Sequence, residues 1–67
     1  MNGRGRYFYA VRLVAIMREL MAARRTAMQL ARQHGVHWRT IVRDIDALSL
    51  AGVPVQRDDD RRYWIER

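Results

Sequence analysis

Apolar residues follow a helical spacing in two long segments of this chain. Over residues 10–23 four of them recur at i, i+3, i+4 and i+7: Leu13, Ile16, Met17 and Leu20. Three more recur at i, i+4 and i+7 over residues 37–50: Ile41, Ile45 and Leu48. Each spacing collects the apolar side chains into one stripe that can face a core. The pattern therefore predicts two amphipathic helices.

A shorter helix is predicted between these two, over residues 26–34. Thr26 can accept hydrogen bonds from free backbone N–H groups at its start, and the residues that follow are nearly all good helix formers. Gly35 can end the helix in the left-handed conformation that glycine adopts easily. Only a few residues then separate it from the helix over 37–50, so we expect a tight turn between the two.

Both ends of the chain lack helical periodicity. Residues 1–6 contain two glycines and two arginines, which predicts a flexible basic arm. Gly52 stops the third helix, and residues 53–66 resemble two strands around a turn of three aspartates, Asp58 to Asp60. The expected fold is mainly α (α+β): three helices and a two-stranded hairpin, in one domain over residues 1–67.

Charge indicates the partner. Thirteen basic residues stand against seven acidic ones, which gives a net charge of +6, and every basic residue is arginine. Planar guanidinium groups suit the phosphates and base edges of nucleic acid. On a helical wheel of the third helix, Arg39 and Arg43 lie opposite the apolar stripe. Two helices joined by a tight turn, the second with outward arginines, are typical of a helix-turn-helix, and the hairpin would form its wing.

A run in the third helix carries a more specific signal: Thr40, Ile41, Arg43, Asp44 and Ile45. With Leu30, Ala31, Val36, Leu48, Gly52 and Tyr63, it resembles the winged helix-turn-helix of DeoR-type and WYL-domain bacterial regulators over about residues 10–65. The resemblance implies that Thr40 and Arg43 contact phosphates or base edges. His37 stands where the family has a capping serine, so the recognition helix either lacks that cap or uses the imidazole.

The expected DNA contacts come from the recognition helix and the wing: His37, Trp38, Arg39, Thr40, Arg43, Arg57, Arg61 and Arg62. Trp38 has a second interpretation, in which it covers the core beside Ile45. Arg43 has one too, in which it pairs with Asp46 on a solvated helix face.

Three further expectations concern charged and apolar residues outside these elements. Arg4 and Arg6 could reach the minor groove as a basic arm, or belong to a disordered tail. Asp44 is expected to form an ion pair with an arginine of the first helix such as Arg12. The surplus apolar residues Val14, Met21 and an outward-facing Trp64 are candidates for a homodimer or partner interface.

Other classes of function find little support. The chain has no cysteine, and Ser49 has no histidine and acid at a suitable spacing, so we expect neither an enzyme nor a cofactor. His34 and His37 make an incomplete metal site, and the three aspartates point in different directions around a turn, so we expect no metal. The longest apolar run, Leu13 to Met17, is too short to cross a membrane.

The sequence thus predicts a regulator, most simply a repressor, that binds duplex DNA as a dimer in the cytoplasm at the nucleoid. No small-molecule ligand is expected, because no residues remain for a sensing domain. The absence of lysine is typical of a GC-rich genome, of a bacterium or a phage. Two alternatives stay open: a protein-interaction module that uses Tyr63, Trp64 and the acidic turn, and an architectural or recombination-accessory DNA-binding protein.

Overall fold

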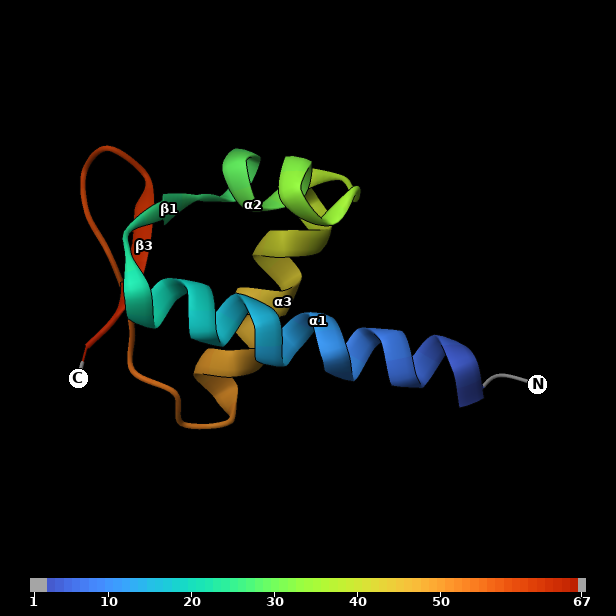
Figure 1. Ribbon diagram of the computed structural model, residues 1–67. Coiled ribbons are helices and arrows are strands. Elements are labelled where there is room, and N and C mark those ends of the chain that lie inside the picture. Colours follow the sequence, from blue (N-terminus) through green and yellow to red (C-terminus); the bar gives the residue numbers. More distant parts are fainter. Residues whose placement is uncertain (1–2, 67) are drawn as a thin grey trace.

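The structure is a computed structural model that describes residues 3–66. Along the chain come three helices and three short strands: α1 (Gly3–Ala22), β1 (Arg25–Thr26), α2 (Ala27–His34), α3 (Trp38–Leu50), β2 (Val55–Arg57) and β3 (Arg62–Ile65). The helices pack together, and the hairpin lies beside them with its loop at the same end of the molecule as α2 (Figure 1). The predicted winged helix-turn-helix is confirmed.

The start of α1 corrects one prediction. Residues 1–6 were expected to form a flexible arm, but the backbone is helical from Gly3 onward, seven residues before the predicted start at Ala10. Gly5 does not prevent this, because the residues after it continue the helix into the long apolar segment. Met1 and Asn2 lie outside the described residues. The first turns of α1 extend away from the other elements (Figure 1).

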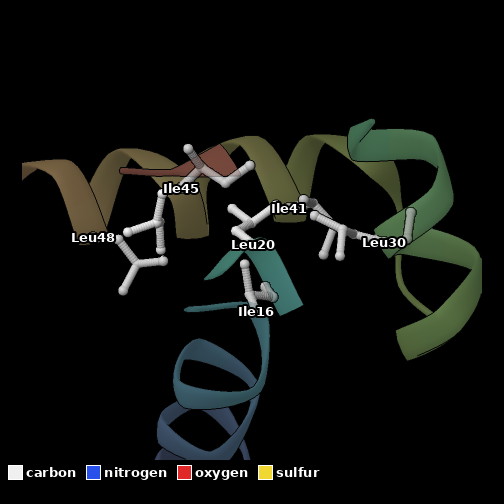
Figure 2. Packing of buried hydrophobic residues seen from close by; sticks show 8 residues of the cluster. Ile16, Leu20, Leu30, Ile41, Ile45 and Leu48 are labelled. Carbon is white, nitrogen blue, oxygen red and sulfur yellow. The ribbon is translucent and has the colours of Figure 1, made fainter. Parts of the chain in front are cut away.

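The core lies where the three helices meet the last strand. Figure 2 shows Ile16 and Leu20 of α1 pointing toward Ile41 and Ile45 of α3. The full set of buried apolar residues is Ile16, Leu20, Leu30, Ala31, Ile41, Ile45, Leu48 and Ile65. The apolar stripes predicted from the sequence therefore supply the core, with Leu13 and Met17 half-buried at its edge.

One charged residue lies inside this apolar cluster. Asp44 of α3 is only 2% exposed, and Arg12 of α1 binds it through two hydrogen bonds, Nε to Oδ2 at 2.6 Å and Nη2 to Oδ1 at 3.2 Å. This confirms the predicted ion pair. The hydrogen bond to the carboxylate raises the pKa of Arg12 above its ordinary value, which partial burial of the guanidinium opposes. The pair ties α1 to the recognition helix.

The wing has one strand more than the sequence predicts. The sheet is antiparallel in the order β1-β3-β2, so the strand from the α1–α2 connection lies on the outer side of the hairpin. Its register pairs Arg25 with Tyr63 and Thr26 with Arg62. A two-residue strand has no periodicity to detect, which is why the pattern did not show it. Its pairing joins the wing to the start of α2.

We expect the loss of Arg12 to destabilise the fold strongly. Arg12→Ala leaves a buried carboxylate without its partner, which costs roughly 3–5 kcal/mol in comparable sites, a large share of the stability of so small a domain. The double variant Arg12→Met/Asp44→Leu removes both charges and should recover most of this loss. Urea unfolding followed by circular dichroism measures the free energy of unfolding of both variants. A single variant as stable as the wild type would contradict the assignment.

Candidate nucleic-acid interface

The turn between α2 and α3 sets the angle between these two helices. Gly35 adopts φ 66° and ψ 35°, the left-handed conformation. The N–H of Val36 donates to the carbonyl oxygen of Ala31 at 3.0 Å, which closes the end of α2. A Cβ at Gly35 would meet nothing within 4 Å. The turn therefore needs glycine for its backbone conformation and not for space.

His37 begins the recognition helix by capping it. Its Nδ1 accepts a hydrogen bond from the N–H of Arg39 at 3.1 Å, and its carbonyl oxygen accepts one from the N–H of Thr40 at 3.0 Å. The imidazole thus takes the place of the expected serine. Because the cap uses the lone pair of Nδ1, an imidazolium ion cannot form it.

Arg39 and Arg43 lie on the exposed side of the first two turns of α3. Neither forms an ion pair within residues 3–66, so the interpretation in which Arg43 pairs with Asp46 is wrong. Asp46 continues the same exposed stripe one turn further along. The stripe is therefore positive in its first half and negative beyond it.

A hollow of about 600 Å³ separates α3 from the wing. Trp38 and Val42 line its α3 side, Arg57 and Arg61 its wing side. Trp38 is 41% exposed and is not among the residues packed against the core, so the interpretation that it covers the core beside Ile45 is wrong. The guanidinium carbon of Arg39 lies 5.4 Å from the centre of its ring. The exposed side chain of Trp38 therefore lines a hollow with Arg39 beside it on α3 and with Arg57 and Arg61 on the wing side.

Asp58 organises the tip of the wing. Its Oδ1 accepts the N–H groups of Asp60 at 2.9 Å and Arg62 at 3.0 Å, and its Oδ2 accepts the guanidinium groups of Arg24 at 3.1 Å and Arg62 at 3.0 Å. The backbone N–H of Arg62 contributes most to lowering the pKa of this carboxyl, and partial desolvation opposes it. The turn of three aspartates is therefore held by a carboxylate whose lowered pKa favours its charged form.

The arginines of the wing divide into two kinds. Arg62 binds Asp58 and Asp60, so its guanidinium is engaged inside the wing. Arg57 and Arg61 are exposed and form no ion pair in the described part of the chain. Arg61 adopts φ 63°, the left-handed conformation that three-residue hairpin loops use at this place. Two of the three predicted wing residues are thus available for a ligand.

Arg24 is a structural residue that the sequence analysis missed. Its guanidinium carbon lies 3.8 Å from the ring centre of Trp64, and its Nη1 donates to Asp58. Trp64 is therefore half-buried, and the expectation that it faces out as a partner surface is wrong. No local signal marks Arg24, because its partners are more than thirty positions away and depend on the pairing of β1 with β3.

The remaining candidates lie away from the recognition helix. Arg6 is exposed on helical α1, and the side chain of Arg4 lies outside the described residues, so a flexible minor-groove arm has no support in the backbone. Val14 and Met21 are exposed on α1 as expected. His34 Nε2 lies 3.0 Å from Oε1 of Glu19, which ties α2 to α1. No three potential metal ligands gather within residues 3–66.

A family model described as HTH domain matches residues 12–61, which include the core, the helix-turn-helix and most of the wing. This match supports a helix-turn-helix DNA-binding domain, and the family is not an enzymatic one. No curated protein and no solved structure matches the chain. No helix in the described part combines the length and apolarity needed to cross a bilayer.

The wing should lose stability in acid through Asp58. Because the pKa of Asp58 is lower in the folded chain than its ordinary value of 3.8, its contribution is complete above that value. The contribution disappears as the pH falls through the folded pKa. The melting temperature of the wild type should fall between pH 6 and pH 2, and that of Asp58→Asn should depend less on pH. Identical curves would mean that the carboxylate does not hold the tip. Asp59→Asn is the matched control, because Asp59 is exposed.

Proposed function

This chain belongs to the HTH domain family, and we propose that it is a sequence-specific regulator of transcription, a repressor, that reads duplex DNA at the nucleoid. The observation that carries the proposal is the pair of exposed arginines in the first two turns of the recognition helix, Arg39 and Arg43, which form no ion pair within residues 3–66. We also propose that it is similar to the DeoR-type and WYL-domain regulators, because of the run from Thr40 to Ile45.

In this proposal the first two turns of α3 enter the major groove. Arg39 and Arg43 can donate two hydrogen bonds each to a guanine edge, which discriminates bases by about 1–3 kcal/mol per contact, or bind phosphates, which makes the affinity depend on salt. Thr40, half-buried beside them, offers a hydroxyl to a phosphate. Asp46 repels the DNA phosphates, so the contact between DNA and α3 involves only the first turns of the helix. Helix-turn-helix proteins read bases in the same way, with the N-terminal residues of this helix.

The wing approaches the DNA backbone on the other side of the hollow. Arg57 and Arg61 supply phosphate contacts, while Arg62 stabilises the tip through Asp58 and Asp60. Trp38, open toward the hollow, can contact a sugar or a thymine methyl group. His37 serves as the cap and lies at the edge of the same surface.

One domain of this size touches few phosphates. Non-specific affinity depends on how many phosphates a protein neutralises, and single small modules bury limited DNA surface. We therefore propose that the chain binds as a homodimer, on two half-sites about one helical turn apart. Because a dimer is needed for affinity, DNA occupancy would rise with protein concentration.

Two alternative functions fit the observed contacts to different degrees. A protein-interaction role through Trp64 and the acidic tip has little support, because Arg24 covers the ring and Asp58 is used inside the wing. An architectural or recombination-accessory role would use the same DNA face. The two DNA roles differ in outcome: an architectural protein bends DNA and covers clustered sites, whereas a repressor occupies one selected operator.

Removing the two arginines of α3 should flatten the salt dependence of DNA binding. We expect log affinity to fall linearly with log salt for the wild type. The slope of Arg39→Ala/Arg43→Ala should be shallower by about one unit for each phosphate that these arginines neutralise in the wild type. Fluorescence anisotropy with labelled random duplex DNA measures this. A double variant that binds like the wild type would place the DNA elsewhere.

The matched control is Arg4→Ala/Arg6→Ala, which removes the same charge from α1. Its slope should stay close to that of the wild type, since these positions lie on the helix that extends away from α3 (Figure 1). An equal flattening in both double variants would mean that only net charge matters.

Neutralising Asp46 should strengthen binding. Asp46→Asn removes a like charge beside the phosphates, and in bulk water one such repulsion at about 4 Å is worth about 1 kcal/mol, or roughly fivefold in affinity. Glu66→Gln, which makes the same change in net charge just after β3, should raise affinity less. Fluorescence anisotropy measures both affinities, and equal gains for Asp46→Asn and Glu66→Gln would argue against contact along the exposed stripe of α3.

A further inference from the structure

A second, mostly apolar face runs along α1, on a different side from the one that packs on the core. It carries five exposed residues spaced alternately by four and three: Tyr7, Val11, Val14, Arg18 and Met21. Tyr7 is 64% and Val14 is 50% exposed. This spacing, with an average of 3.5 residues, is the one that places side chains along the seam between two packed helices. We call these five residues the α1 seam.

The exposed area of the chain fits an uncovered seam of this kind. The protein exposes 5100 Å², whereas a compact monomer of 8.0 kDa should expose about 4,450 Å². The excess of about 650 Å² approaches the ~800 Å² that each partner buries in a standard interface. The first turns of α1, which extend beyond the other elements (Figure 1), carry the exposed side chains of Tyr7 and Val11.

We propose that a second copy of this chain covers the α1 seam, with the two α1 helices antiparallel and Val11 of each copy facing Val14 of the other. In this register, Tyr7 of each copy lies level with Arg18 of the other. The two valine layers form the centre, and a guanidinium over an aromatic ring closes each end. The chain already uses that contact internally, where Arg24 lies over Trp64 at 3.8 Å.

Charge selects the antiparallel direction. A parallel pair would place Arg18 beside Arg18 of the second copy, at a seam position with no acid to compensate. The only acid described on α1, Glu19, already binds Gln33 and His34. Shifting the antiparallel helices by one heptad would instead place Arg18 against Val14. The proposed register is the one that gives both arginines an aromatic partner.

This interface serves the proposed function but does not depend on it. A two-fold contact relates the two recognition helices by symmetry, which is what a palindromic pair of half-sites requires. DNA binding and dimerisation respond to salt in opposite ways. Screening weakens DNA binding, but it should strengthen a dimer of two chains that each carry +6.

Cysteine cross-linking tests the register directly, because the chain has no native cysteine. A mixture of Tyr7→Cys and Arg18→Cys chains should form a mixed disulfide, identified by mass spectrometry, and keep one Tyr7–Arg18 contact. Met21→Cys alone should not cross-link, because its two copies would lie about 25 Å apart along the helix pair. Cross-linking of Met21→Cys to itself, without the mixed product, would overturn the antiparallel arrangement.

Sedimentation across a concentration series then tests the surface. The wild type and Leu50→Glu should dimerise, and more strongly in higher salt, whereas Val14→Glu should stay monomeric with an unchanged circular dichroism spectrum. Leu50 is the matched control because it is 89% exposed at the end of α3. A wild type that stays monomeric, or a Val14→Glu dimer of equal strength, would overturn the proposal.

A last variant separates this proposal from the proposed function. Arg39→Ala/Arg43→Ala should dimerise like the wild type even though it binds DNA poorly. A wild type that dimerises but binds no DNA would leave the seam standing and refute the regulator proposal. Dimerisation that is lost in this variant would place the interface on α3 and overturn the seam.

Discussion

The ion pair between Arg12 and Asp44 ties α1 to the core side of the recognition helix. Asp44 is buried among apolar residues of α3 and is bound at both carboxylate oxygens. Neighbouring residues on a helix point about 100° apart, so an inward Asp44 turns Arg43 outward, and Arg39 lies one turn before it on the same side. A pair of buried charges costs solvation and adds little net stability. Asp44 faces the same core as Ile41, Ile45 and Leu48, so the charged pair and the apolar stripe agree on one rotation of α3 about its axis.

Two further contacts place the wing beside that face. The pairing of β1 with β3 joins the wing to the start of α2, and Asp58 holds the tip by collecting hydrogen bonds from Arg24, Asp60 and Arg62. The result is a molecule with two separate surfaces. The basic one lies across α3 and the wing, and the apolar α1 seam lies on the helix that packs behind α3. A chain this small can therefore pair with itself without covering the face proposed for DNA.

Much of this fold follows from local patterns in the sequence. Apolar spacing gave α3 and the core side of α1, and Thr26, Gly35 and His37 are end signals that act within a few residues. The ion pair of Arg12 could be predicted because Asp44 falls on the core side of a helical wheel. Contacts that depend on distant pairing could not be predicted: β1, the stacking of Arg24 on Trp64, and the half-buried state of that tryptophan. The early start of α1 was missed because its exposed turns lack a core-facing stripe.

The central claim is that DNA lies against the start of α3 and the wing. An NMR titration of the uniformly ¹⁵N-labelled protein with duplex DNA tests it residue by residue. If DNA lies there, the amide signals from Trp38 to Arg43 and from Arg57 to Arg62 shift together as DNA is added, while those from Tyr7 to Val14 on α1 stay in place. Shifts centred on α1, with α3 unchanged, would contradict it.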